Sequence, residues 1–297
     1  KEVGGMWYGF AWESQLSETA LQIALLACPI CSWRDGPPAR SKGGGPAGAV
    51  RGMALHHHLA RCCLAWLAFR IMLAAGLLKL RARDPCWKDY TCFSYHYENM
   101  PMPNPLSWWA HHLPQAVQAW IQFVSIQGIE VCLPFGFLFC LLEWVPPLRG
   151  LCRCMRRSAA VGCMLLMAGI QSTGNYSFLN VTTCLPCLAC LDDAVLKPVV
   201  PRFLQPRPRP AERSLTHAFR TLCVVAASVF LVVLSLPGAS WLWSGKDAFR
   251  GVPTVAVRLW RDVGRPLDLG NLYSSGRFAH ITRERLELVL WALRCDG

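Results

Sequence analysis

Charged residues are scarce in this sequence, and the motifs that would identify an enzyme are missing. Asp, Glu, Lys and Arg make up 16% of the 297 residues and hydrophobic residues 53%, whereas soluble domains carry about 25% charged residues. There is no H-E-x-x-H or Cys/His zinc pattern, no glycine-rich nucleotide loop after a strand and no G-x-S-x-G elbow. These absences argue against a metalloprotease, a nucleotide-dependent enzyme and a lipase, and no cofactor or metal is expected. The composition is typical of a membrane protein.

The positive net charge does not indicate a nucleic-acid partner. The formal charge is +12, but the Lys and Arg residues lie in short segments between apolar runs instead of forming one basic face. We interpret them as signals of membrane topology. Most of the 16 cysteines lie inside apolar runs, where Cys packs as a small hydrophobic residue. A disulfide scaffold of the small secreted type is therefore not expected.

Six apolar runs approach the roughly 20 residues that a transmembrane helix needs. They cover about residues 14–33, 59–80, 119–142, 158–174, 177–196 and 218–243. The fourth and fifth runs are short and are joined by the turn "TGNYS", so they form either a tilted hairpin or a pair of which one does not cross completely. We predict an all-α membrane protein, a bundle of about six transmembrane helices within residues 1–263.

The distribution of basic residues predicts the orientation of the bundle. Lys and Arg number four in residues 34–58, four in 143–157 and five in 192–217, and such an excess marks cytosolic loops. The interleaved segment 81–118, in which acidic residues balance the basic ones, should face the lumen. After residue 264 the polarity becomes mixed, and "LELVL" alternates as a strand does. We therefore expect residues 264–297 to begin a luminal, β-rich C-terminal domain.

The predicted luminal loop 81–118 contains an aromatic stretch, "RDPCWKDYTCFSYHYENMPMPNPLSWWAHHLP". Its large rings belong to Trp87, Tyr90, Phe93, Tyr95, Tyr97, Trp108 and Trp109. Such amphipathic side chains suit a surface that binds a client protein or the bilayer interface. The simpler alternative is an aromatic belt and a proline-ordered cap over the helix bundle. Cys86 and Cys92 lie six residues apart in this loop, and in an oxidising compartment they are candidates for a disulfide.

The same loop offers residue types that serve general acid–base catalysis. They are Asp84, Asp89, His96, Glu98, His111 and His112. Their spacing matches no known catalytic arrangement, but an enzyme that acts on lipid or protein at this His-rich loop stays open as an alternative function. A second group, His56 to His58, lies at a predicted membrane edge, where we expect solvated side chains.

An ionised group inside a membrane span carries a cost and indicates pairing or function. Among the charges in the predicted spans, Glu18, Arg70 and Glu130 draw attention. Arg70 and Glu130 each lie about eleven residues into their helices, and we predict that they form a structural ion pair near the midplane. The alternative is a cavity for a lipid head group or small ligand, with Asp192, Asp193 and Lys79 at its ends.

Four segments of the chain resemble the lipase maturation factors, a family of multi-pass membrane proteins of the endoplasmic reticulum. The longest is "FRIMLAAGLLKLRARDPCWKDYTCFSYHYENMPMPNPLSWWAHHLP", which contains the hallmark of that family. The others are "FAWESQLSETALQIALLACP", "STGNYSFLNVTTCLPCLACLDD" and "NLYSSGRFAHITRERLELVL", so that the resemblance covers most of residues 10–290. Three departures occur: Ala82 with Arg83 stands where the family has one Gly, Leu286 replaces a Pro, and "WALRCDG" replaces a Gly-containing continuation. Family members are longer, so we expect a core fragment.

The resemblance implies a function and a set of site residues. Lipase maturation factors help certain secreted dimeric lipases to reach an active, assembled state, which implies a non-catalytic, chaperone-like factor with client lipases and membrane lipids as partners. The family-motif positions, candidates for client binding, are Asp84, Cys86, Trp87, Asp89, Tyr95, His96, Tyr97, Glu98, Pro103, Asn104, Pro105, Trp108 and His112. Glu18, Arg70 and Glu130 match the family inside the membrane. Gly174, Asn175, Asn180, Asp192 and Asp193 match it around the hairpin turn, where we expect the two sequon asparagines to close the turn and contact neighbouring helices.

Overall fold

The fold is known from a computed structural model. It describes residues 12–27, 55–100, 104–174, 176–201, 203, 205, 214–244, 249, 251–270 and 280–284. These residues are mostly helical, and none of them lies in a strand. The all-α prediction is confirmed to that extent. The stretch "LELVL" lies outside the described residues, so the β-rich domain and the boundary after residue 263 stay predictions.

The bundle consists of five single helices and one composite helix, which is a succession of short helical segments. They are α1 (Trp12–Ala27), α2 (Leu55–Arg81), α7 (Arg149–Thr173), α8 (Leu179–Ala189) and α10 (Ser214–Ser244), together with the succession α5 (Gln115–Phe123), η3 (Val124–Cys132), α6 (Phe135–Leu138) and η4 (Phe139–Leu142). The bounds shift by several residues from the predicted runs, as expected at helix ends that composition alone does not mark. Each predicted run corresponds to one of these helices.

Three helices of the described residues are long and apolar enough to cross a membrane. They cover His57–Arg81, Gln115–Leu142 and Thr221–Leu242. Helix α1 has 16 residues and α8 has 11, both short of the roughly 20 that a span needs. Helix α7 has 25 residues, but Arg149, Arg153, Arg156 and Arg157 occupy its first part. Three of the six predicted spans are thus supported by length and composition, and the other three stay predictions.

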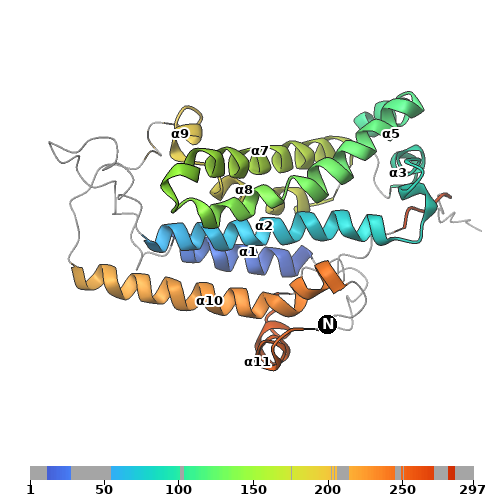
Figure 1. Cartoon of the computed structure of the whole chain (residues 1–297). Coiled ribbons are helices and arrows are strands. Elements are labelled where there is room, and N and C mark those ends of the chain that lie inside the picture. The colour runs from blue at the N-terminus through green and yellow to red at the C-terminus, as the bar shows by residue number, and fades with distance from the viewer. Residues whose placement is uncertain are drawn as a thin grey trace, which may run out of the picture.

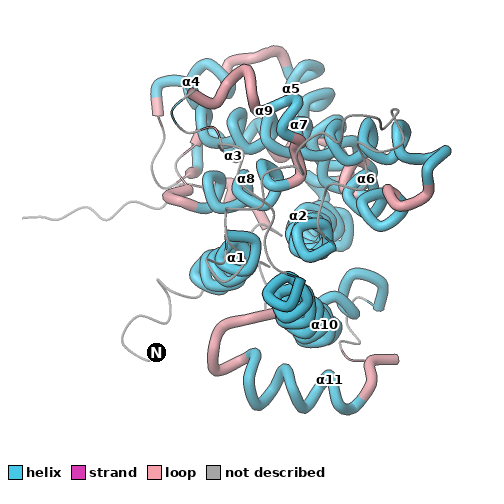
Figure 2. Tube along the Cα trace, turned by 90° about the vertical axis from the view of Figure 1, so that its left-hand side faces the viewer, coloured by secondary structure: helices cyan, strands magenta, loops and turns pink. Residues whose placement is uncertain are grey.

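Helix α2 lies at the centre of the bundle, and the helices alternate in direction. Figure 1 shows that α2 and α10 run in the same direction, towards the end of the molecule that carries α3 (Phe93–Asn99) and α5. The opposite end carries α9 (Asp193–Leu196). Helix α2 packs against α1, α8, α10 and η3, and Figure 2 shows α1, α2 and α10 close to end-on. The described parts of the predicted luminal loop 81–118 and of the predicted cytosolic segments 143–157 and 192–217 therefore lie at opposite ends.

The core of the bundle explains why α2 is apolar around most of its circumference. Ala68, Phe69 and Met72 of α2 are buried together with Phe137 of α6 and Cys163 of α7. A helix that contacts neighbours on several sides buries residues all round, so that it shows no narrow apolar stripe. Small residues allow the closest approaches. A Cβ on Gly76 of α2 would lie 2.7 Å from Cγ2 of Val131 on η3.

The predicted loop 81–118 is not an irregular loop. It contains η2 (Pro85–Trp87), α3, α4 (Pro105–His111) and the start of α5. Asn104 begins α4: its Oδ1 accepts the Ser107 N–H at 2.9 Å, and Ser107 Oγ accepts the Asn104 N–H at 3.0 Å. Pro105 follows at the first helical position, where its missing N–H costs nothing. Local capping therefore turns the Pro-rich sequence into a helix.

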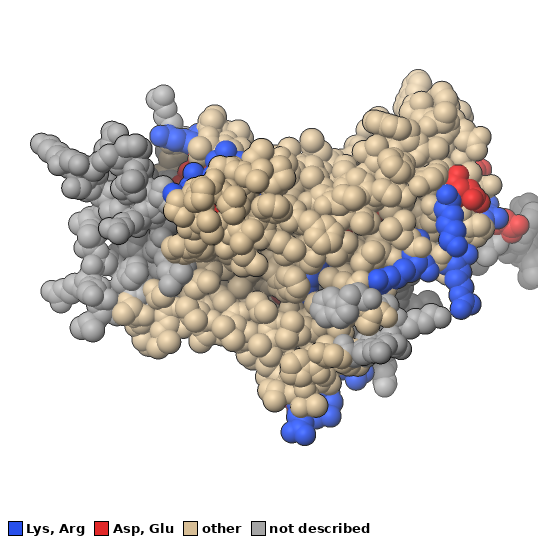
Figure 3. Space-filling model, viewed as in Figure 1, with Lys and Arg blue, Asp and Glu red and all other residues tan. Residues whose placement is uncertain are grey.

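The molecular surface separates charged ends from an apolar middle. In Figure 3, Lys and Arg gather towards the two ends and over the lower edge, and a broad band between them is almost free of charge. Large exposed hydrophobic side chains lie along the helices, among them Leu165 of α7, Val181 of α8, and Leu222 and Val229 of α10. An exposed apolar surface of this extent is unfavourable in water and suits the hydrocarbon core of a bilayer.

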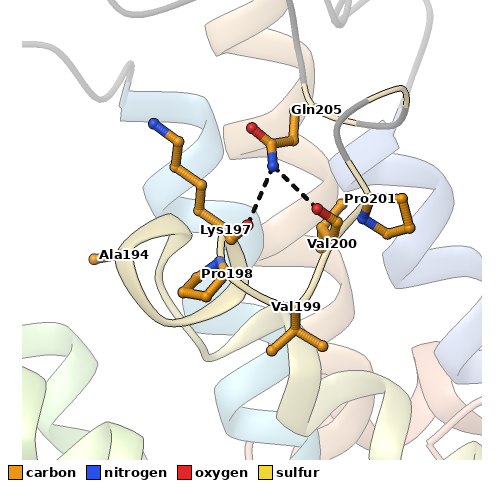
Figure 4. A pocket seen from close by; sticks show the side chains of 7 residues that line it. All are labelled: Ala194, Lys197, Pro198, Val199, Val200, Pro201 and Gln205. Atoms are coloured by element: carbon orange, nitrogen blue, oxygen red, sulfur yellow. Dashed lines mark hydrogen bonds between the residues drawn. The ribbon is translucent and has the colours of Figure 1, made fainter.

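Two smaller features complete the described part. Helix α11 (Thr254–Leu259) and η7 (Trp260–Gly264) pack against α10. A pocket of about 540 Å³ lies after α9, lined by residues within 194–201 and by Gln205. Gln205 Nε2 donates to the carbonyl oxygens of Lys197 at 3.1 Å and Val200 at 3.0 Å (Figure 4). These bonds close a short turn in the Pro-rich connector, and the lining offers no acid–base pair.

Candidate functional site

A disulfide closes the first turn of the aromatic loop. Cys86 and Cys92 are bonded, with 4.7 Å between their Cα atoms, and both are buried. Asp84 caps η2, since its Oδ1 accepts the Cys86 N–H at 3.2 Å. Gln122 of α5 donates to the Cys86 carbonyl oxygen at 3.2 Å. The start of the loop is thus a fixed, cross-linked unit that is held against α5.

Trp87 is part of the core of this unit and not of its surface. Its exposed fraction is 5%, so the expectation of an exposed ring at this position is wrong. Lys79 Nζ lies 5.7 Å from the centre of a Trp87 ring and forms an ion pair with Glu130, with N–O distances of 2.5 and 2.6 Å. The Lys79 ammonium group is attracted both to the face of the indole ring and to the Glu130 carboxylate, so that the three groups stabilise one another. Glu130 therefore holds the base of the loop.

The predicted ion pair between Arg70 and Glu130 is wrong. Arg70 of α2 pairs with Glu18 of α1 instead, and the second carboxylate oxygen of Glu18 accepts the Gly270 N–H at 3.1 Å. The reason is helical geometry. Arg70 and Lys79 are nine residues apart, which at 3.6 residues per turn places them about 180° apart around α2. Arg70 consequently faces α1, and Lys79 faces η3.

His96 fastens the loop to the turn that precedes α8. Its Nε2 lies 2.8 Å from the Tyr176 hydroxyl, and the two rings are stacked at 6.3 Å with planes 5° apart. Burial, and secondarily the charge of Lys79, lower the pKa of His96 to about 4. A Cβ on Gly174 would lie 2.6 Å from Tyr176, so the turn needs a residue without a side chain there.

Of the two sequon asparagines, the structure describes Asn180. Asn180 is buried, and its Nδ2 donates to Gln171 Oε1 of α7 at 2.9 Å. A buried, hydrogen-bonded amide of this kind is not accessible to a glycosylating enzyme. Asn175 lies outside the described residues. Asn104 provides a further link to α7, because its Nδ2 donates to the Ser172 carbonyl oxygen at 3.0 Å.

Helix α4 presents the exposed aromatic surface of the loop. Trp108 and Trp109 have exposed fractions of 56% and 66%. Their rings meet edge to face at 5.0 Å. His112 is exposed and packs its ring on Trp108, with 4.0 Å between the ring centres, while its Nδ1 donates to the Trp108 carbonyl oxygen at 2.7 Å. We call Trp108 and Trp109 the tryptophan pair.

The remaining loop positions lie in different environments. Asp89 and Glu98 are exposed, Tyr95 and Tyr97 are half-buried, and Pro103 lies outside the described residues. The guanidinium of Arg283 lies 5.5 Å from the centre of the Tyr95 ring and 3.5 Å from Asp84. Within the described residues, His96, His111 and His112 do not gather with carboxylates or thiols into a metal-binding group. The structure therefore brings the motif residues together as a scaffold.

A buried charge cluster at the opposite end of the bundle was missed by the sequence analysis. Arg156, whose exposed fraction is 0%, contacts Glu143 at 2.5 Å and Asp192 at 2.8 Å. Arg61 contacts the same two carboxylates, each at 3.3 Å, and Arg157 contacts Asp192 at 2.5 Å. We call these five residues the arginine cluster. Arg61 lies within a predicted span, and this intramembrane charge was the signal that could have located it.

Two members of the hairpin set have different environments. Asp192 joins α2 to α7 through the arginine cluster, whereas Asp193 is exposed. Lys79 is paired with Glu130 near the other end of α2. A single ligand cavity with Asp192, Asp193 and Lys79 at its ends is therefore not formed by the described residues. Asp192 and Lys79 are instead each paired with an opposite charge.

Comparison with known proteins identifies the family. A family model described as "Lipase maturation factor transmembrane domain" matches residues 1–198, which is about two thirds of the chain. The chain belongs to the lipase maturation factor family. The match includes the disulfide-closed loop, the tryptophan pair and the arginine cluster. With the three apolar helices, it identifies a membrane protein.

Relatives in this family are similar over most of the chain. Lipase maturation factor 1 of Homo sapiens is 33% identical over 309 residues, covering 97% of this chain and 46% of the relative. The protein of the same name in Bos taurus is 32% identical over 301 residues, with the same coverage. Lipase maturation factor 2 of Homo sapiens is 35% identical over 195 residues, covering 65% of this chain and 24% of the relative. The chain spans about half the length, or less, of these relatives, and no solved structure matches it.

Proposed function

We propose that this chain is the membrane core of a non-catalytic factor that assists the folding and assembly of secreted lipases in the endoplasmic reticulum membrane. The family name of its relatives supports a role in lipase maturation. The observation that carries the proposal is the loop architecture. A disulfide, the Asn104 cap and the His96–Tyr176 contact order the loop around helix α4, on which the tryptophan pair is exposed.

The tryptophan pair is the client-facing surface in this proposal. Large amphipathic rings that are fixed before binding lose little conformational entropy on contact, which is why they dominate binding energy at interfaces. The rest of the loop supports the pair, because Gln118 of α5 donates to the His111 carbonyl oxygen at the end of α4 at 2.7 Å. Client lipases and membrane lipids are the partners, and nucleic acid is not one.

An enzyme at the His-rich loop is the weaker alternative. Burial keeps His96 neutral, and this residue contacts Tyr176. His112 is exposed. Catalysis needs a base and an orienting group within hydrogen-bond reach. The loop residues that the structure describes do not provide that pair.

Rescue of secreted lipase tests the proposal. Cells that lack their own maturation factor are supplied with this chain, with full-length human lipase maturation factor 1, or with empty vector, and secreted lipase activity is divided by secreted lipase protein. We expect both proteins to raise the ratio above vector. If only the full-length protein does so, the function requires parts outside this chain. If neither does, the assay is uninformative about this chain, and a second lipase client replaces the first until the full-length protein rescues.

Substitutions separate a binding surface from an active site. Replacing Trp108 and Trp109 together by Ala should lower the ratio several-fold, because interface tryptophans typically contribute about 2 kcal/mol each. Trp120, 64% exposed on α5 within a candidate span, is the matched control, and its replacement by Ala should change the ratio less than twofold. Equal losses in the Trp108/Trp109 variant and in the Trp120 variant would indicate that the tryptophan pair contacts the bilayer interface and not a client. Complete loss on a conservative change of His96, His111 or His112, with normal expression and client binding, would favour the enzyme.

A further inference from the structure

Three side chains with thiol and imidazole groups converge beside the arginine cluster. His58 and Cys62 lie one turn apart on α2, and Cys140 lies on η4. Cys62 Sγ is 3.1 Å from Cys140 Sγ and 3.4 Å from His58 Nε2, and the three atoms lie within 4.8 Å of one another. His58 is buried and packs edge to face against Trp144 at 5.0 Å, so the expectation of a solvated His58 is wrong. The maturation function proposed above uses none of these groups.

Arg61 determines which nitrogen of His58 carries the proton. Arg61 Nη2 lies 3.2 Å from His58 Nδ1, and a guanidinium group can donate but cannot accept. Nδ1 is therefore the acceptor, and the proton of the neutral ring lies on Nε2, which faces Cys62. The imidazole thus donates a hydrogen bond to the Cys62 sulfur. Such a bond, with a nearby positive charge, stabilises a thiolate.

The same arrangement argues against a metal ion. A protonated Nε2 has no lone pair for a metal. The neighbouring arginine cluster also holds three cations against two carboxylates. A net positive environment opposes a divalent cation and favours an anionic sulfur. Thiol chemistry is therefore the better match.

We propose that Cys62 and Cys140 are a thiol–disulfide site whose substrates are small disulfides such as oxidised glutathione. Cys62 is half-buried and Cys140 has an exposed fraction of 1%, so Cys62 attacks and Cys140 resolves. The Cys62 thiolate attacks one glutathione sulfur, forms a mixed disulfide and releases one glutathione thiolate. The Cys140 thiolate then attacks the Cys62 sulfur, forms the Cys62–Cys140 bond and releases the second glutathione thiolate. Two protein thiols are oxidised, one glutathione disulfide is reduced, and the two protein protons pass to the released thiolates.

The new bond would join two candidate membrane spans. Cys62 lies in His57–Arg81, and Cys140 lies in Gln115–Leu142. On the predicted topology this end of the bundle faces the cytosol, where thiols are kept reduced. The dithiol is then the resting form. Oxidation would fix α2 to η4 next to the arginine cluster and so restrict movement of the two spans.

Disulfide mapping on the full chain tests the proposal. The chain, purified in detergent, is incubated with oxidised glutathione, its free thiols are blocked with N-ethylmaleimide, and the linked peptides are identified by mass spectrometry. We expect a peptide in which Cys62 is joined to Cys140, lighter by two hydrogen atoms than the sum of the reduced peptides. Cys163 and Cys187 are the matched control, because they also contact each other but are both fully buried. This pair should stay reduced.

Variants then test the roles of the Cys62 and Cys140 thiols and of the His58 imidazole. Cys140→Ser should trap glutathione on Cys62, and Cys62→Ser should leave Cys140 unmodified. His58→Phe should slow bond formation about tenfold, because it removes a hydrogen bond to a charged group. Thermal unfolding of each variant verifies that it is folded, and the mapping on the unchanged chain stands without any variant.

Three results would overturn the proposal. The first is absence of the Cys62–Cys140 peptide from the unchanged chain at millimolar oxidised glutathione. The second is oxidation of Cys163 and Cys187 at an equal rate, which would show that proximity alone decides. The third is protection of Cys62 and Cys140 from maleimide by added zinc that stays bound through desalting, which would make the cluster a metal site.

Discussion

The Tyr176 hydroxyl and His96 Nε2 lie 2.8 Å apart although 80 residues separate them in the chain. Their stacked rings join the aromatic loop to the turn before α8. Because burial lowers the pKa of His96 to about 4, the contact is made by a neutral imidazole at neutral pH. We therefore expect protonation of His96 to disturb the position of the loop.

Acidification should weaken this contact. The folded-state pKa of about 4 lies below the ordinary value of 6.5, so between these values the unfolded chain binds more protons than the folded one. Stability is thus highest above about pH 6.5 and falls as the pH drops towards 4, by at most about 3 kcal/mol from this residue. Thermal unfolding in detergent at pH 7.5, 6 and 5 measures the change, and His96→Gln should unfold with a smaller dependence on pH. If the unfolding temperature of the His96→Gln variant depended on pH as much as that of the unchanged chain, His96 would not be the cause of the pH dependence.

Breaking the Glu18–Arg70 pair on one side should be costly. Both groups are buried, and loss of one partner leaves an uncompensated charge, which costs about 3–5 kcal/mol. We expect Glu18→Gln and Arg70→Met each to lower the midpoint of unfolding strongly, and the double variant to recover part of the loss. Thermal unfolding of all four proteins forms a double-mutant cycle. Simple addition of the two losses would mean that the groups do not interact.

Gly76 should tolerate no side chain. A Cβ there would lie 2.7 Å from Val131 Cγ2 and 3.0 Å from Glu130 Cβ, so Gly76→Ala must separate α2 from η3 and should destabilise the chain by about 1–3 kcal/mol. Gly169 of α7 is the control, because nothing lies within 4 Å of its would-be Cβ, and Ala is the better helix former by about 1 kcal/mol. Gly169→Ala should be neutral or stabilising. Equal effects on unfolding temperature would refute the close helix contact.

Removal of the Cys86–Cys92 disulfide should loosen the loop more than the bundle. The bond closes a short segment with a sequence separation of 6, for which the chain-entropy relation gives about 2 kcal/mol. We expect the Cys86→Ser, Cys92→Ser double variant to be cleaved faster by protease within residues 84–113. The α2 and α10 segments should keep their protection. Uniform loss of protection would show that the disulfide supports the whole bundle.

Composition and local sequence pattern were sufficient to predict where the helices lie. Each predicted apolar run corresponds to a helix, because burial and lipid contact both require apolar side chains. The Asn104–Ser107 cap and Pro105 are local signals of a helix as well, although a loop was predicted for this region. The membrane class and the family could be read from residues alone.

The partners of individual side chains could not be predicted from composition and local pattern. Arg70 and Glu130 lie at similar depths along their helices, so a pair between them was predicted. The rotation of α2 about its axis instead places Arg70 beside Glu18 and Lys79 beside Glu130. Trp87 and His58 were expected at the surface because their neighbours in the sequence are polar or lie at a membrane edge. Both are buried, because residues distant in sequence cover them.

The sequence by itself determined that this protein is a helical membrane protein of the lipase maturation factor family with an aromatic segment. These properties follow from apolar run lengths and from contiguous motifs. Only the tertiary structure decided which charges pair, which rings stay exposed and which thiols meet. Those properties depend on the rotation and packing of helices against one another, which bring together residues such as Cys62 and Cys140, 78 positions apart, and no local pattern encodes that approach.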